Sequence, residues 1–230
     1  MTNIAVIPAR GGSKRIPRKN VKNFCGKPII AYSIEAAIKS GCFDKVIVST
    51  DDQEIAQIAI SYGAEVPFIR PDSLSEDFSV VTDTVVHAIN EMENQFNLVI
   101  DYVCLIYATA PLIEDFYISQ GLKELLNSEK SFAIGVTSYA FPIQRALSIK
   151  NGNIERVSDN RDTRSQDLEE YYHDAAHFCW GSRAAFVEKR DFFSNASIPI
   201  VIPRSLVQDV DTPEDWDFAE LLYKAKSSAR

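Results

Sequence analysis

The sequence has little of what a disulfide-stabilised, zinc-stabilised or membrane-spanning protein needs. Its four cysteines lie far apart, with no CxxC pair and no histidine at zinc-finger spacing, so neither a disulfide framework nor a structural zinc site is expected. No apolar run approaches the roughly 18 residues that cross a bilayer. The first residues also lack the charged start and long apolar run of a signal peptide. We therefore expect a soluble protein of the cytoplasm with free thiols.

The chain also lacks a positive net charge. Its 230 residues include 24 Lys and Arg against 32 Asp and Glu, a formal charge of −8. This balance argues against general binding to nucleic acids or anionic membranes, because both need a positive protein face. An apolar content of 46%, with 10% aromatic residues, is enough for a packed core. A disordered or fibrous protein is thereby excluded, and we expect one domain over residues 1–230.

The charge is distributed unevenly along the chain. Residues 1–34 contain seven Lys and Arg and no acidic residue, whereas the rest contain 17 Lys and Arg against 32 acidic residues, a balance of −15. A basic segment on an acidic body indicates a local site for a small anion rather than a surface for a polyanion.

Short apolar segments rich in β-branched residues alternate with helical patterns, which predicts an α/β fold with a mainly parallel sheet. The expected strands are 4–7, 45–50, 66–69, 102–107, 132–138 and 198–202. The expected helices are 29–39, 52–62, 82–96, 114–126 and 213–226, with a polar loop leading from 71 to about 78.

Residues 139–177 depart from this alternation. They contain Asn151-Gly152-Asn153, a turn signal flanked by Ile149 and Ile154, followed by a polar and charge-dense stretch. We interpret this segment as a hairpin and loop inserted into the α/β body, acting as a lid or a dimerisation arm.

The loop after the first strand, residues 8–20, is the first candidate site. It leaves the strand at its carboxyl end, where open α/β sheets bind their ligands. Gly11 and Gly12 permit close backbone approach, Ser13 offers a hydroxyl, and five cations follow within ten residues, which suits a polyphosphate. The loop matches neither GxxxxGK[ST] nor GxGxxG followed by a helix. P-loop and dinucleotide-binding interpretations therefore lack motif support.

Asp209-Val210-Asp211 forms the second candidate, just before the last expected helix. In an extended segment residues i and i+2 point to the same side, so both carboxylates can meet one Mg²⁺ ion. Alone, the pattern fits a helix-capping Asp211 better than a metal site. A polyphosphate loop in the same chain reverses that preference.

The third candidate joins residues 161–168 with residues 172–181. Arginines can clasp a carboxylate in bidentate fashion, and Gln, His and aromatic side chains commonly line sugar pockets, although an ordinary surface loop fits the same pattern. His173 and His177 are four residues apart and flank Asp174, but no third ligand accompanies them, so we do not expect catalytic zinc.

Residues 8–20 resemble the nucleotide-binding signature of the sugar-acid cytidylyltransferases, the CMP-sialic acid synthetase (acylneuraminate cytidylyltransferase) family. Four further segments recur in the family's order, so the resemblance covers nearly the whole chain: Arg70-Pro71, Ala108 to Leu112, Arg164 to Leu168, and Asp209 to Thr212. It implies a Rossmann-like nucleotidyltransferase fold of the GT-A type. Tyr107 to Pro111, Phe141 to Arg145, and His173 to Gly181 resemble the members that activate pseudaminic acid. The sialic acid synthetases are expected to carry Gln in place of Tyr107 and Asn-Gly in place of Ala175-Ala176.

The reaction that the resemblance implies is the Mg²⁺-dependent conversion of CTP and pseudaminic acid to CMP-pseudaminic acid and pyrophosphate, for surface or flagellar glycosylation. The anomeric hydroxyl of the sugar acid would attack the α-phosphorus. Activation of N-acetylneuraminate or legionaminate, a CTP-binding protein without turnover, and a nucleotidyltransferase for a hexose phosphate remain alternatives. The resemblance also implies a homodimer, with no nucleic-acid or membrane partner.

The resemblance assigns a role to each candidate residue. Those expected to bind CTP are Arg10, Gly11, Gly12, Ser13, Lys14, Lys19, Asn20, Arg70 and Thr109; Arg10, Lys19 and Asp211 are expected to be catalytic. Asp209 and Asp211 would hold Mg²⁺. The expected sugar-binding residues are Tyr107, Arg145, Arg164, Gln166, His173, His177 and Phe178.

Overall fold

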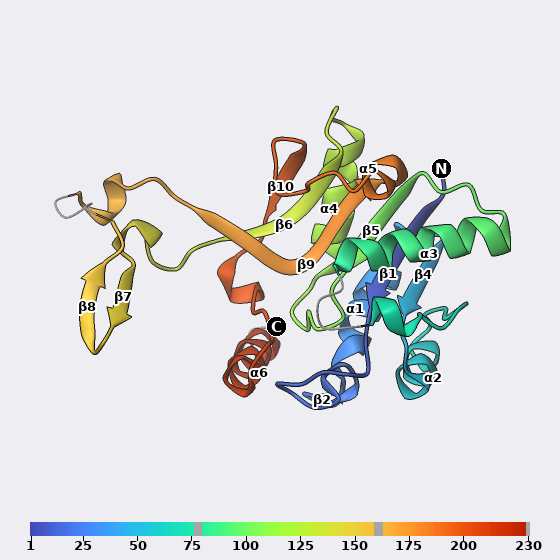
Figure 1. Cartoon of the computed structure of the whole chain (residues 1–230), viewed down its shortest axis with the longest axis horizontal. Coiled ribbons are helices and arrows are strands. Elements are labelled where there is room, and N and C mark those ends of the chain that lie inside the picture. The colour runs from blue at the N-terminus through green and yellow to red at the C-terminus, as the bar shows by residue number, and fades with distance from the viewer. Residues whose placement is uncertain (76–79, 159–162, 229–230) are drawn as a thin grey trace.

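A six-stranded sheet forms the centre of the computed structural model, which describes residues 1–75, 80–158 and 163–228 (Figure 1). Its strand order is β10-β6-β9-β5-β1-β4. The strands are β1 (Asn3–Pro8), β4 (Lys45–Ser49), β5 (Tyr102–Ile106), β6 (Phe132–Ser138), β9 (Tyr172–Ser182) and β10 (Ser197–Val201). β1 runs parallel to β4 and β5, and β10 runs parallel to β6, whereas β9 is antiparallel to both β5 and β6. The predicted mainly parallel α/β fold is confirmed.

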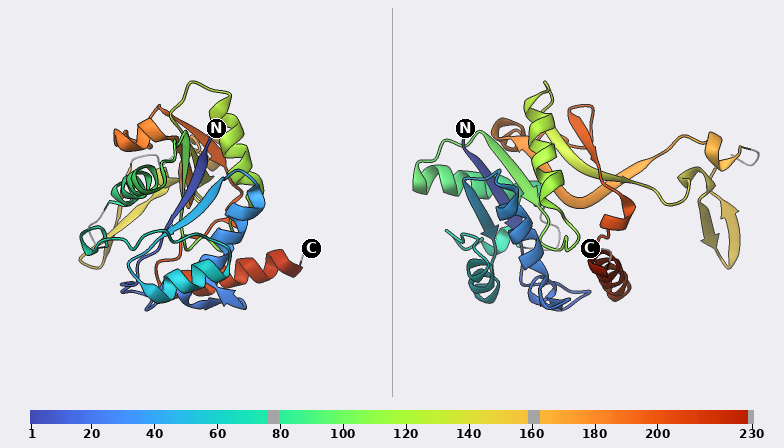
Figure 2. Two further views of the ribbon diagram at one scale, coloured as in Figure 1. Left: turned by 90° about the vertical axis from the view of Figure 1, so that its right-hand side faces the viewer. Right: turned by 180° about the vertical axis from the view of Figure 1, so that it is seen from behind.

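Helices cover both faces of this sheet (Figures 1 and 2). The helices are α1 (Ile29–Ser40), α2 (Gln53–Ser61), α3 (Val81–Phe96), α4 (Asp115–Leu126), α5 (Arg183–Val187) and α6 (Pro213–Ser228). One apolar cluster joins the sheet to α1, α2 and α4, and a second joins its other face to α3 and α5. Because both faces are covered, the sequences of the strands are nearly continuously apolar.

A third cluster attaches α6 to the start of the chain. The short hairpin β2 (Asn23–Phe24) and β3 (Lys27–Pro28) places Phe24 edge-on to Trp216 of α6, with ring centroids 5.4 Å apart. Tyr32 of α1 packs in the same cluster and donates a hydrogen bond to the carbonyl of Phe24 at 2.7 Å. The segment between β1 and α1 is thereby held against α6.

The course of the chain creates a crevice beside β1. From β1 the chain crosses to β4 on one side of it and then to β5 on the other. All three strands are parallel, so their carboxyl ends share one edge. A change of direction of this kind is where doubly wound folds bind ligands, and it brings together the segments that follow β1 and β5.

Two expectations about the strands were wrong. The segment expected to form a strand over 66–69 makes only isolated bridges, Ile47 with Glu65 and Thr50 with Ile69, because it leaves the sheet edge after single contacts. β9 was not predicted: the insertion was expected to extend to residue 177, but residues 172–174 already pair with β6. Its bulge, where the register against β6 shifts and Ala176 adopts φ 50°, interrupts the alternation that predicts a strand.

The described residues between β6 and β9, 139–158 and 163–171, form an arm that extends away from the sheet (Figures 1 and 2). The predicted hairpin is present as β7 (Leu147–Lys150) and β8 (Asn153–Arg156), joined by Asn151 and Gly152 at φ 52° and 78°. This pair of positive φ values is what a two-residue turn between twisted strands requires. Residues 159–162 of the predicted charged stretch, and residues 76–78 of the predicted polar loop, lie outside the described residues.

The loop after β1 is fastened to the segment after β4. Asp52 caps α2 by accepting a hydrogen bond from the Ile55 amide at 3.0 Å. The same carboxylate receives two hydrogen bonds from the guanidinium of Arg18, at 2.5 and 3.0 Å. Its neighbour Asp51 accepts a hydrogen bond from the Gly11 amide at 2.9 Å. Both ends of the basic loop are therefore anchored by adjacent carboxylates.

Within the part of the chain that is described, no helix is both long enough and apolar enough to span a membrane.

A first prediction concerns Gly181 in β9. A Cβ atom there would lie 2.6 Å from the ring of Phe132 and 2.8 Å from that of Phe186, and both rings are fully buried. We expect Gly181→Ala to lower the free energy of unfolding by about 1–3 kcal/mol, because a packed core cannot absorb the extra methyl without strain. Gly12→Ala is the matched control, since nothing lies within 4 Å of its added Cβ. Urea unfolding that shows equal stabilities for the two variants would contradict this packing.

A second prediction concerns Arg18. Its hydrogen bonds lower the pKa of Asp52 to about 2, so the charged pair stabilises the fold above the ordinary Asp pKa near 4 and loses that contribution as pH falls through 2. We expect Arg18→Ala to destabilise the protein by about 1 kcal/mol at pH 7, because the half-exposed pair is screened by solvent.

The measurement is urea unfolding of wild type and Arg18→Ala at pH 7 and near pH 2.5. The difference in the free energy of unfolding between wild type and Arg18→Ala should be smaller at pH 2.5 than at pH 7. The surface variant Arg190→Ala should differ less from wild type at pH 7 than Arg18→Ala does. If Arg18→Ala lowers the free energy of unfolding equally at both pH values, the ion pair is not the cause of the loss.

Candidate functional site

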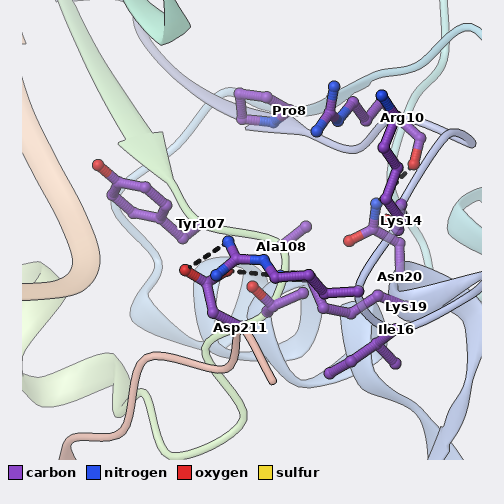
Figure 3. A pocket seen from close by; sticks show the side chains of 12 residues that line it. Pro8, Arg10, Lys14, Ile16, Lys19, Asn20, Tyr107, Ala108 and Asp211 are labelled. Carbon is purple, nitrogen blue, oxygen red and sulfur yellow. Dashed lines mark hydrogen bonds and ion pairs between the residues drawn. The ribbon is translucent and has the colours of Figure 1, made fainter. Parts of the chain in front are cut away.

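A pocket with a volume of about 420 Å³ lies at the carboxyl edge, where the fold creates the crevice. Three separate segments line it: the loop after β1, the residues after β5, and the segment before α6. The lining residues are Pro8, Arg10, Ser13, Lys14, Arg15, Ile16, Lys19, Asn20, Tyr107, Ala108, Thr109 and Asp211. The structure thus brings together most of the predicted CTP-binding residues (Figure 3).

Asp211 is the centre of the charge pairing in this pocket. Its two carboxylate oxygens lie 2.9 Å from Nη2 of Arg15 and 3.3 Å from Nζ of Lys19. Lys19 also donates to the carbonyl of Val210 at 2.6 Å. Figure 3 shows this carboxylate among the cations of the loop, with Tyr107 across the pocket from Arg10 and Lys14. The pocket therefore combines a polycationic loop with a carboxylate, which suits a polyphosphate and its counter-ion.

Only part of the basic segment faces the pocket. Four of its cations line it: Arg10, Lys14, Arg15 and Lys19. The other three support the fold: Arg18 pairs with Asp52 and Glu54, Lys22 lies over the ring of Trp216 at 4.3 Å, and Lys27 pairs with Glu35. The basic segment therefore serves the expected anion site with four of its seven cations, while two of the others pair with acidic side chains and one lies over an aromatic ring.

The two glycines of the loop differ in the space around them. An added Cβ at Gly11 would lie 2.6 Å from Oδ2 of Asp52, so a side chain there would displace the carboxylate that anchors Arg18. Nothing lies within 4 Å of an added Cβ at Gly12. Asn20 is buried and donates from Nδ2 to the carbonyl of Arg10 at 2.9 Å, which fixes the loop in its curved shape.

Arg70 lies beneath the loop and does not line the pocket. It is 4% exposed, its Nε donates to Oγ of Ser75 at 3.1 Å, and its guanidinium lies 3.9 Å from the carboxylate of Asp51. Burial lowers the pKa of Arg70, and the nearby charge of Asp51 opposes that shift. Arg70 thus reaches the loop through Asp51, which also holds the Gly11 amide.

Asp209 does not line the pocket with Asp211, and both residues lie in the irregular segment between Leu206 and the start of α6. The pKa of Asp209 is raised by desolvation and then by the negative charge of Asp211. Among the described residues no three His, Cys, Asp or Glu side chains gather closely enough to hold a metal ion alone. Two carboxylates nevertheless fit Mg²⁺, which is commonly held by one or two carboxylates together with water and substrate phosphates.

The predicted sugar-binding residues of β9 separate in the structure. His177 and Phe178 are buried: Phe178 packs against Gly121 and Gly135 in the core, and burial lowers the pKa of His177 to about 3. His173 is exposed and lies against Tyr139, with ring centroids 4.8 Å apart. The expectation that His177 and Phe178 contact the sugar is corrected, because the β9 strand carries them into the interior.

The three predicted sugar-binding residues of the arm lie away from the pocket. Arg145 donates to the carbonyl of Thr163 at 2.8 Å, Arg164 pairs with Asp167 at 2.7 Å, and Gln166 lies in the same short helix as Asp167. None of the three lines the pocket of its own chain. The arm that carries them extends away from the sheet (Figure 1).

Four residues that position or complete the site were not predicted as site residues. They are Arg15, Asp51, Asp52 and Asp174. A signal existed for the pair Asp51-Asp52, because these carboxylates follow β4 directly and parallel strands share a carboxyl edge. Asp174 lies in the unpredicted strand β9, where it accepts a hydrogen bond from the Tyr107 hydroxyl at 3.4 Å.

The chain was compared with known proteins. Residues 4–217 match the family model described as cytidylyltransferase. The pseudaminic acid cytidylyltransferase of Campylobacter jejuni serotype O:23/36 is 44% identical over 97% of both chains. The CMP-N,N'-diacetyllegionaminic acid synthase of Legionella pneumophila is 32% identical, over 100% of this chain and 99% of that one.

Among solved structures, a CMP:2-keto-3-deoxy-manno-octonic acid synthetase complexed with CTP superposes with a TM-score of 0.72. The alignment covers 98% of this chain and 100% of that chain at 17% identity, which establishes a common fold and no more. The match to the family model spans β1 to the first turn of α6, and so includes the basic loop, Tyr107 and Asp211. The chain belongs to the cytidylyltransferase family.

Proposed function

We propose that this cytidylyltransferase joins the CMP group of CTP to pseudaminic acid and releases pyrophosphate. The observation that carries the proposal is the 44% identity, over 97% of both chains, to a pseudaminic acid cytidylyltransferase. Identity to the legionaminic acid enzyme is lower, at 32%, and identity to an N-acylneuraminate cytidylyltransferase of Streptococcus agalactiae is 28%. Pseudaminic acid is therefore the preferred acceptor.

The triphosphate would lie against the cations of the loop. Arg10, Lys14 and Lys19 come from three points of one curved segment, so together they can neutralise phosphate oxygens that a single cation could not reach. Fixed cations aimed at the phosphates stabilise the charge that develops during nucleotidyl transfer. Gly12, Ser13 and Thr109 would approach the same ligand, and Arg70 would support the loop from beneath.

Asp209 and Asp211 would hold Mg²⁺ when CTP is bound. A bound Mg²⁺ neutralises phosphate charge and can lower the pKa of a nearby hydroxyl. Arg15 and Lys19, which pair with Asp211 in this structure, would then be available to the phosphates. Asp211 would thus exchange its contacts with the two cations for a metal ion, and the cations would bind phosphate oxygens instead.

A release assay tests the function. The protein is incubated with CTP and Mg²⁺ and with pseudaminic acid, legionaminic acid or N-acetylneuraminic acid in turn, while pyrophosphate is followed. We expect the highest kcat/KM with pseudaminic acid. Preference for another acid of the panel would contradict the acceptor, and CTP binding without release for any acid would indicate a nucleotide-binding protein without turnover.

We expect Asp211→Asn to lower kcat by about 10³-fold, the scale seen when a charge-neutralising group is lost from a phosphoryl-transfer site. The surface variant Glu124→Gln, on an exposed position of α4, is the control and should keep wild-type kcat. Steady-state kinetics over a range of Mg²⁺ concentrations provide the measurement. Near-normal turnover of Asp211→Asn at saturating Mg²⁺ would exclude Asp211 as a metal ligand.

The arm of residues 139–171 suits an interface with a second copy of the chain. A two-stranded hairpin is marginal on its own, and this one exposes Ile149 and Ile154 by 77% and 70%. Phe141, near the base of the arm, is 82% exposed. We infer that these apolar groups are covered in a homodimer, which would also bring Arg145, Arg164 and Gln166 towards the pocket of the partner.

We expect wild type to sediment as a dimer and the double variant Ile149→Asp, Ile154→Asp to sediment as a monomer, because buried unpaired carboxylates oppose association. Exposed Phe116 of α4 offers the matched control, Phe116→Asp, which should remain dimeric. Analytical ultracentrifugation is the measurement. A wild-type monomer at micromolar concentration would contradict the assigned role of the arm.

A further inference from the structure

The backbone of Tyr107 is fixed on both sides. Tyr107 follows the last residue of β5, and its amide donates to the carbonyl of His177 on β9 at 3.0 Å. Its own carbonyl accepts a hydrogen bond from Oγ of Ser33 on α1 at 2.7 Å. The direction in which the ring leaves the chain is therefore set by the sheet and by α1.

The hydroxyl of Tyr107 is directed by Asp174. It donates to Oδ2 of Asp174 over 3.4 Å, while Oδ1 of the same carboxylate accepts a hydrogen bond from the amide of Ala176 at 2.8 Å. Ala176 has φ 50°, a conformation that costs energy for a residue with a Cβ, and it lies in the bulge of β9. One carboxylate thus holds both the bulge and the ring that lines the pocket.

The pocket consequently has two walls of opposite character. The loop after β1 provides four cations, whereas Tyr107 lines the pocket from the end of β5, with the carboxylate of Asp174 accepting the hydrogen bond of its hydroxyl. An anionic group of a ligand is favoured on the first side and disfavoured on the second.

We propose that Asp174 is a positioning residue that sets acceptor specificity, by holding the Tyr107 hydroxyl so that this wall offers an aromatic face and only hydrogen-bond acceptors. The inference rests on the proposed function. The acceptor sugar would turn its hydroxyl or amide N–H donors and its methyl groups towards Tyr107, and its carboxylate towards the cations of the loop.

Tyr107 would select the acceptor because it can offer few hydrogen-bond donors to the bound sugar. A tyrosine has a single O–H, and once it is donated to Asp174 the phenolic oxygen can only accept. An amide side chain at the same position would offer both donors and an acceptor. Tyr107 and Asp174 together therefore disfavour a substrate that places a carboxylate or another hydrogen-bond acceptor against Tyr107. Such a group would lose its water and find no donor.

The test compares Asp174→Asn, Tyr107→Phe and the double variant with wild type, and uses Glu124→Gln as the surface control. Asp174→Asn keeps the shape of the side chain but can no longer accept from both Ala176 and Tyr107. KM for pseudaminic acid and kcat come from pyrophosphate release, CTP affinity comes from calorimetry without acceptor, and thermal unfolding reports folding.

We expect Asp174→Asn to raise the acceptor KM by about tenfold, the loss of one hydrogen bond to a charged group, while the Kd for CTP changes less than twofold. Adding Asp174→Asn to Tyr107→Phe should change the acceptor KM no further, because Asp174 acts through the hydroxyl. If Asp174→Asn fails to fold, Tyr107→Phe alone must show the raised acceptor KM with unchanged CTP affinity.

An unchanged acceptor KM in the folded variants would overturn the inference. So would additive effects, or a loss of CTP affinity equal to the rise in acceptor KM. These results leave the proposed function intact. No pyrophosphate release by wild type with any nonulosonic acid would overturn the proposed function and, with it, the role of Asp174 in acceptor choice.

Discussion

The contact of Asp211 with Arg15 and Lys19 joins parts of the chain that are about 190 residues apart, and the site depends on it. The loop after β1 cannot form a pocket alone, because a cluster of cations without a counter-charge repels itself. Asp211 supplies that charge from the segment before α6, and α6 is held there by the contact of Trp216 with Phe24. Packing of α6 against the segment that contains Phe24 therefore helps to place the carboxylate beside the loop.

This arrangement gives the loop two sets of partners with different purposes. Asp51 and Asp52 hold Gly11 and Arg18 at its two ends, so they determine its shape whether or not a ligand is bound. Asp211 pairs with cations that also line the pocket, so these contacts can exchange for phosphate oxygens and a metal ion. A rigid frame with exchangeable charges inside it suits nucleotidyl transfer, where positioning and neutralisation of charge supply most of the catalysis.

Much of this could be read from the sequence, because strong local patterns coincide with the observed elements. β6 and the start of α6 at Pro213 match their predicted bounds, and the Asn151-Gly152 turn forms its hairpin. β9 was missed because its bulge breaks the alternation, and with it the roles of His177, Phe178 and Asp174 were misjudged or overlooked. Burial and pairing between distant segments, such as Arg18 with Asp52, depend on tertiary structure and have no local signal.

The central claim is that the pocket between the basic loop and Asp211 joins CMP to pseudaminic acid. Phosphorus NMR of a reaction with CTP, Mg²⁺ and pseudaminic acid tests it most directly. We expect the three CTP resonances to disappear and one phosphodiester resonance to appear with an equimolar amount of pyrophosphate. Release of free CMP without a sugar phosphodiester, or persistence of CTP in the presence of folded enzyme, would contradict it.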